Sequence, residues 1–265
     1  MEQTYHFHVI TIACASVFLA QLGMMMYLPA LPALALSLQT TDALTSLALP
    51  IYLVGMALPM LFLGKWGAWI GLKPVLMLSL VVFAISSTLA ALSTDVEVFL
   101  CARFTQGLGA SGISVMARSL IAHHFKGNEL AKALSLLSIA FVVSLGIGQY
   151  AGALLMSAFG WPVIFYVLAL GSVVLIVIIY RYLLNSPRAN ETPVCWGHYL
   201  SIARHLPFLR AAFIGGLGYG IIIAFNTAAP AIFQRTYQWS VNDYGRLGWG
   251  MSLAYLLGSL SVSRY

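Results

Sequence analysis

Arg103 and Gln106 are the residues whose types and spacing most clearly indicate chemistry. They lie three positions apart in a long apolar stretch, so a helix would place both side chains on one face. Arg103 is the only charged residue away from the ends of such stretches, and all seven Asp and Glu residues lie in loops or near stretch ends. A charge at the centre of a bilayer costs about 2.5–3.5 kcal/mol or more, and such residues mark solute pathways. The pair therefore indicates transport; the alternative is a structural role in which Arg103 bonds to backbone carbonyls or to Gln21.

Four further residues are candidates to line such a pathway. Gln21 and Met25 lie one helical turn apart in the first apolar stretch, while Gln149 lies in the fifth and Asn226 in the seventh. Methionine is flexible and polarizable, which suits apolar binding surfaces, although packing or lipid contact explains it equally well. Because Arg103 has no counter-acid in the membrane, a neutral or anionic solute is favoured over a cationic one.

The sequence offers no group suited to carrying protons through the membrane. Arginine stays protonated at any reachable pH. The six histidines all lie in loops or at the edges of apolar stretches: His6, His8, His123, His124, His198 and His205. We therefore expect transport without proton coupling. Catalytic clusters, phosphate-binding loops and metal-binding cysteine spacings are not found either, so we predict no enzyme activity, no metal and no cofactor.

Eight apolar stretches position these residues. Hydrophobic residues make up 61% of the chain and charged residues 8%, whereas soluble domains carry about 25% charged residues. Crossing a bilayer takes about 20 apolar residues. Stretches of that size cover 8–30, 43–66, 73–93, 97–121, 132–157, 161–184, 208–232 and 245–263, with Pro29 and Pro32 predicted to end the first. The prediction is an all-α polytopic membrane protein.

The distribution of basic residues predicts the orientation. A cytoplasmic N-terminus places nine of them inside: Lys65, Lys73, Arg118, Lys126, Lys132, Arg181, Arg188, Arg204 and Arg210. Only Arg235 and Arg246 then lie on the opposite side. The net charge of +6 follows from this bias and does not indicate nucleic-acid binding. We expect a six-helix bundle over 1–184, a cytoplasmic linker over 185–207 with a short interfacial helix, and the start of a second bundle over 208–265.

The stretch around Arg103 resembles motif B of the major facilitator superfamily, which reads Arg, two residues, Gln, Gly, one residue, Gly. Arg103, Gln106, Gly107 and Gly109 match it. In that family the arginine lies near the cavity and participates in proton coupling or substrate handling. The segment 27–32, Tyr-Leu-Pro-Ala-Leu-Pro, resembles the end of the first span in the bicyclomycin-resistance-type (Bcr/CflA) drug:proton antiporters. The resemblance implies inverted three-helix repeats, a midplane site and efflux of drugs or small solutes.

Motif A of that family is present in altered form, and acids expected from the resemblance are missing. The loop between the second and third stretches resembles motif A through Gly64, Lys65, Gly71, Lys73 and Pro74. Ala68 stands at that motif's aspartate, so the conformational latch that the acid makes should be weak. Acids are also missing at two further positions, because Met25 replaces a membrane aspartate and His123 replaces the aspartate of an Arg-Asp pair.

Small residues indicate where helices approach closely. Gly107 and Gly109 remove side-chain bulk beside Arg103. Gly148 and Gly152 continue a stripe that begins at Ser144 and resembles antiporter motif C, with Gln149 where that motif has proline.

Six stretches, a longer loop and two more stretches look like one complete half followed by part of another. We therefore expect a C-terminally truncated product of a longer transporter, located in the inner membrane. The predicted partners are a small-molecule solute or drug and the lipid bilayer; the oligomeric state stays open. The alternative function is a degenerate or truncated fragment that does not transport and acts, if at all, as a membrane interaction protein.

Overall fold

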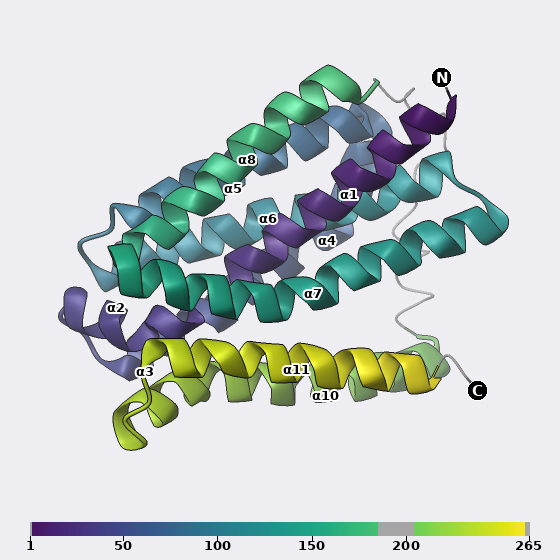
Figure 1. The fold of residues 1–265 in the computed structure, drawn as a ribbon. Coiled ribbons are helices and arrows are strands. Elements are labelled where there is room, and N and C mark those ends of the chain that lie inside the picture. The colour runs from purple at the N-terminus through teal and green to yellow at the C-terminus, as the bar shows by residue number, and fades with distance from the viewer. Residues whose placement is uncertain (1, 185–203, 263–265) are drawn as a thin grey trace.

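The computed structural model describes residues 2–184 and 204–262, and these contain helices and no strand (Figure 1). Eight long helices correspond to the eight predicted stretches: α1 (Glu2–Met25), α4 (Ala48–Ile70), α5 (Leu72–Ala91), α6 (Val96–His124), α7 (Gly127–Phe159), α8 (Pro162–Tyr182), α10 (Leu206–Ala231) and α11 (Val241–Val262). Shorter elements lie at the turns: η1 (Leu28–Ala30), α2 (Leu31–Ser37), α3 (Asp42–Ser46) and η2 (Ile232–Thr236). The all-α prediction is confirmed, whereas the predicted interfacial helix lies almost wholly outside the described residues.

Six helical segments of the described chain are both long and apolar enough to cross a membrane: Tyr5–Ser37, Asp42–Ile70, Leu72–Ala91, Gly127–Phe159, Pro162–Tyr182 and Leu206–Thr236. Helices α6 and α11 are also long enough, with 29 and 22 residues, but they are less apolar. The reason in α6 is its polar content, which includes Arg103, Gln106 and Arg118. Hydropathy alone therefore supports six of the eight predicted spans.

The prediction that Pro29 and Pro32 end the helix of the first span is wrong. Helix α1 stops at Met25, before Pro29 and Pro32, and the chain then continues through η1 and α2. Pro29 and Pro32 occupy the first turns of η1 and α2, where a missing N–H group costs no hydrogen bond. The prolines thus begin new helical segments after a bend.

Helices α1 and α4–α8 form one bundle; α11 packs along α7, and α10 contacts η1, α2, α3 and α4 (Figure 1). Helix α6 packs closely against α4 and α5 through glycines. A methyl group added at Gly107 would lie 2.2 Å from the backbone oxygen of Tyr52, and one added at Gly109 would lie 2.8 Å from that of Ser79. These short approaches hold α6 tightly between α4 and α5.

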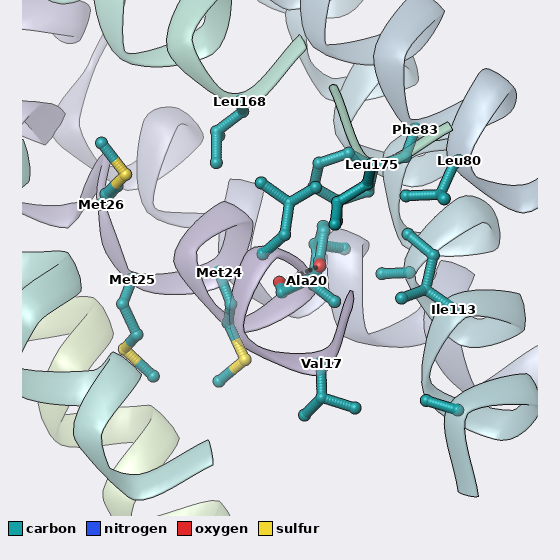
Figure 2. Packing of buried hydrophobic residues seen from close by; sticks show 14 of the residues in the cluster. Val17, Ala20, Met24, Met25, Met26, Leu80, Phe83, Ile113, Leu168 and Leu175 are labelled. Atoms are coloured by element: carbon teal, nitrogen blue, oxygen red, sulfur yellow. Dashed lines mark hydrogen bonds between the residues drawn. The ribbon is translucent and has the colours of Figure 1, made fainter. Parts of the chain in front are cut away.

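Three consecutive methionines lie inside the bundle near the end of α1. Met24, Met25 and Met26 are exposed by only 1%, 3% and 2%. Figure 2 shows them beside other buried side chains that include Phe83 and Leu168. They therefore pack against protein and do not face lipid.

Candidate functional site

Arg103 is fully buried in α6 and ties this helix to α1. Its Nη1 donates to the backbone oxygen of Gly23 at 3.0 Å and to Oε1 of Gln106. The Nε2 of Gln106 in turn donates to Oγ of Ser87 at 2.7 Å, and that hydroxyl donates to the carbonyl of Phe83. The predicted shared face of Arg103 and Gln106 thus becomes a polar network that runs from α1 through α6 to α5.

Aromatic rings surround the guanidinium group where a counter-acid is missing. The ring centroids of Tyr27, Tyr52 and Phe165 lie 4.1, 4.5 and 5.8 Å from Cζ of Arg103. Tyr52 is held in place because its hydroxyl donates to the carbonyl of Ala20 at 2.9 Å. The negative faces of such rings attract a cation, most strongly where water is excluded. We call these three rings the aromatic cage.

Sequence reasoning did not find the aromatic cage. Tyr27 lies just after α1, Tyr52 in α4 and Phe165 in α8, so no local spacing connects them. Only the packing of three helices around α6 brings the rings to Arg103. The Nε and Nη2 groups of Arg103 have no hydrogen-bond partner among the described residues.

The two predicted pathway residues of α1 do not bond to Arg103. Gln21 is 4% exposed, and its Oε1 has no hydrogen-bond partner in the described part of the chain. Met25 packs against α7, since a Cβ added at Gly148 would lie 3.1 Å from the Met25 Cβ. The alternative prediction was that Arg103 bonds to a backbone carbonyl or to Gln21. The structure shows the bond to a carbonyl, that of Gly23, and no bond between Arg103 and Gln21.

Gln149 and Asn226 lie together although they are 77 residues apart in the sequence. The Nε2 of Gln149 in α7 donates to Oδ1 of Asn226 in α10 at 2.8 Å, and both residues are 2% exposed. Two of the predicted pathway residues thus form a direct bond between the six-helix bundle and the α10–α11 pair.

An apolar groove of about 450 Å³ runs between α1 and α7, within the range of ligand sites. Its lining residues are Ile10, Thr11, Cys14, Ala15, Phe18, Leu136, Ile139, Ala140 and Val143. The Thr11 hydroxyl is satisfied by the carbonyl of Phe7 at 2.9 Å. The groove contains none of the predicted pathway residues.

The motif A segment holds helix ends in place. Gly71 ends α4 with φ of +109°, a conformation that favours glycine. Lys73 donates to the carbonyl of Leu183 at 2.6 Å and to that of Tyr180 at 3.4 Å. A cation at this point interacts favourably with the C-terminal end of α8. Gly64 and Lys65 belong to α4 and are not in a loop.

Histidines gather where α1 begins and α6 ends. His124 Nε2 lies 3.5 Å from the hydroxyl of Tyr5, and its Nδ1 lies 2.9 Å from the carbonyl of Leu120. His123 contacts the His124 ring at a centroid distance of 5.1 Å. Burial lowers the pKa of His124, and nearby His123 and His6 lower it further against the backbone bond, which raises it. The described residues include no cluster of His, Cys, Asp and Glu that could hold a metal ion.

Comparison with known proteins places these features in a wider group. The family model described as "Major Facilitator Superfamily" matches residues 13–265. Proteins named "Multidrug resistance protein MdtL" from Salmonella heidelberg (strain SL476) and Salmonella typhi are 30% identical over 233 residues. The match covers 87% of this chain and 59% of each relative, so the chain spans well under two thirds of their length.

Solved structures show a similar fold at low identity. A bacterial homologue of the human lysosomal transporter Spinster, crystallised in an inward-facing, unoccupied conformation, has a TM-score of 0.80 at 16% identity. The match covers 98% of this chain and 64% of that one. A D-xylose-proton symporter has a TM-score of 0.75 at 16% identity, covering 98% of this chain and 70% of the other. These likenesses concern the fold alone.

Proposed function

Because the chain belongs to the Major Facilitator Superfamily, we propose that it acts in secondary transport, moving small solutes across the membrane by alternating access. The multidrug-resistance names of its relatives support efflux of drugs or drug-like solutes, and the segment 27–32 supports a place among the Bcr/CflA-type exporters. The observation that carries the proposal is Arg103, a fully buried cation held between the first and fourth spans. Such a charge is retained in a membrane mainly for function.

The positive charge of Arg103 favours a neutral or anionic solute. Arg103 keeps two donor groups, Nε and Nη2, without a partner in the described residues. A rearrangement that opens the contact between α1 and α6 would let a solute oxygen take up those donors. A cationic solute would meet the positive charge with no acid nearby to compensate it, because the Asp and Glu residues of the described chain, among them Asp42, Asp95 and Glu97, lie at helix ends.

We further propose that this transport is not coupled to protons. Met25, which stands at the membrane aspartate of the resembling antiporters, is buried against α7 and cannot titrate. The histidines of the described chain near α6 lie at its end, far along the helix from Arg103. Dissipating a proton gradient should therefore leave solute movement unchanged. Met25→Asp should introduce a pH dependence, and an unchanged pH profile would count against Met25 lining the pathway.

The proposed location is the inner membrane, with the N-terminus in the cytoplasm. The predicted excess of Lys and Arg on one side supports this orientation. Labelling of single cysteines near residue 36 and near residue 126 with an impermeant reagent, in intact cells and in inverted vesicles, would test it. Reaction of both sites from the same side would exclude the proposed arrangement.

The decisive experiment measures solute movement by Arg103→Ala in vesicles that contain the intact protein. We expect transport to be lost while membrane insertion survives. Arg118→Ala is the matched control, because Arg118 lies in the same helix and its one hydrogen bond in the described chain is to the carbonyl of Ser114, at 3.3 Å and within α6. Transport by the parent that persists in Arg103→Ala would refute the role of Arg103. If the parent protein neither transports nor binds any solute, a membrane interaction protein without transport activity becomes the better proposal.

A further inference from the structure

Arg103 is buried with hydrogen-bond donors that the protein does not use. Its guanidinium group carries N–H donors on all three nitrogens. Nη1 donates to the carbonyl oxygen of Gly23 and to Oε1 of Gln106. Nε and Nη2 have no hydrogen-bond partner among the described residues. The edge of the guanidinium that these two nitrogens form therefore lacks an acceptor.

The hydroxyl group of Tyr27 is a second buried donor without a partner. Tyr27 is fully buried, and its oxygen makes no hydrogen bond within the described part of the chain. Its ring centroid lies 4.1 Å from Cζ of Arg103, the shortest such distance in the aromatic cage. The hydroxyl of Tyr52 differs, because it donates to the carbonyl of Ala20. Arg103 and the ring nearest to it thus both carry unpaired donors.

The protein supplies no negative side chain to compensate the charge of Arg103. In the described chain, Arg235 and Arg246 pair with Asp42 and Asp243, whereas Arg103 has no acidic partner. The ring faces of the aromatic cage attract the cation, but they accept hydrogen bonds from N–H groups only weakly. A buried donor without an acceptor is costly, and more so when it carries charge. Both the charge and the geometry therefore call for an anion at this edge.

We propose that Arg103 and Tyr27 bind a small inorganic anion, with chloride as the ion to test, as the counter-ion of the buried guanidinium. Nε and Nη2 point the same way from the planar group, which is the fork that arginine offers to anions. The Tyr27 hydroxyl supplies a further donor. Because both side chains are fully buried, the site suits an ion of one or a few atoms.

The position of Tyr27 provides a way for the anion to enter. Tyr27 lies in the bend between α1 and η1, outside both helices, so its side chain can adjust without breaking a helical turn. The net charge of +6 favours the approach of anions. A water molecule would satisfy the same donors but would leave the charge uncompensated. This site goes beyond the proposed transport function and does not depend on it.

The test measures chloride binding by the intact protein in micelles, with no solute present. Sodium chloride replaces sodium gluconate at constant ionic strength and pH, since gluconate is too large for a fully buried site. The width of the chloride NMR line reports exchange between free and bound ions. The melting temperature reports stabilisation of the folded state by a bound ligand. We expect chloride to broaden the line and to raise the melting temperature, both in a saturable way.

Two tyrosine variants test the geometry of the site. Tyr27→Phe should weaken chloride binding about tenfold, the effect of losing one hydrogen bond to a charged group. Tyr52→Phe is the matched control, because it removes a hydroxyl from the same cage that donates to the backbone of Ala20. Its affinity for chloride should equal that of the parent. Equal weakening in the two variants would contradict the proposed role of Tyr27.

Two arginine variants separate this site from chloride binding elsewhere. Arg103→Met should abolish the saturable broadening, whereas Arg118→Met, in the same helix, should retain it. Saturable broadening that persists in Arg103→Met, or its absence from the parent, would overturn the anion site. If Arg103→Met does not fold, the comparison of Tyr27→Phe with Tyr52→Phe decides. Because the measurement needs no solute, a failure of transport would leave this result standing, and transport without chloride binding would refute this inference alone.

Discussion

The aromatic cage makes a quantitative prediction about how a lone cation is tolerated inside the bundle. Tyr52 is 1% exposed, its ring centroid lies 4.5 Å from Cζ of Arg103, and its hydroxyl donates to Ala20. Tyr52→Phe loses only the hydrogen bond and should cost about 1 kcal/mol of unfolding free energy. Tyr52→Leu also loses the ring over the cation, which should add about 2 kcal/mol at a site without water.

The added cost of Tyr52→Leu over Tyr52→Phe should depend on the charge of Arg103. In an Arg103→Met background the cation is gone, so the step from Phe to Leu should cost close to nothing beyond its change in packing. The measurement is a double-mutant cycle of reversible unfolding in mixed micelles, followed by helical circular dichroism. Coupling of about 2 kcal/mol between positions 52 and 103 is the expected result.

A buried tyrosine in another helix, α11, which makes no recorded contact with Arg103, provides the control. Tyr244 is 1% exposed and packs beside Phe233 with ring centroids 6.2 Å apart. The step from Tyr244→Phe to Tyr244→Leu should cost the same in the parent and in Arg103→Met. If the difference in unfolding free energy between Tyr52→Phe and Tyr52→Leu were also the same in both backgrounds, the rings would only fill space. The proposed stabilisation of Arg103 by the aromatic cage would then be refuted.

Three further predictions concern packing, helix ends and pH. Gly152→Ala would place a methyl group 1.8 Å from the backbone oxygen of Met26, the residue after α1, and should cost about 1–3 kcal/mol in the same unfolding assay. Gly218→Ala, with open space around it, should cost nothing. Lys73→Gln removes the cation at the end of α8 and should lower the free energy of unfolding by about 0.3–1 kcal/mol. Lys73→Arg keeps the charge and should retain most of this stability. Equal losses in both variants would rule out the charge effect. His124 has a pKa below its ordinary value, so the folded state binds fewer protons than the unfolded state and loses stability as pH falls below about 6.5. Melting temperatures between pH 5 and 8 should show this loss in the parent and less of it in His124→Gln, and parallel curves would contradict it.

The sequence by itself determined the all-α membrane class, the family and the shared face of Arg103 and Gln106. The membrane class and the shared face depend on composition and on the helical repeat, and the family was indicated by the resemblance of short motifs; all of these are local properties of the chain. The ends of helices were less certain, because Pro29 and Pro32 begin new helical segments after a bend and do not stop the first span.

Only the tertiary structure decided what surrounds the key residues. Arg103 is contacted by the rings of Tyr27, Tyr52 and Phe165, which come from three separate parts of the chain. Gln149 bonds to Asn226, 77 residues later in the sequence. Which helical faces meet depends on the bend after α1 and on the close approaches that glycines permit between helices. Periodicity shows that a side chain lies on a face, whereas its partner follows from how whole helices cross.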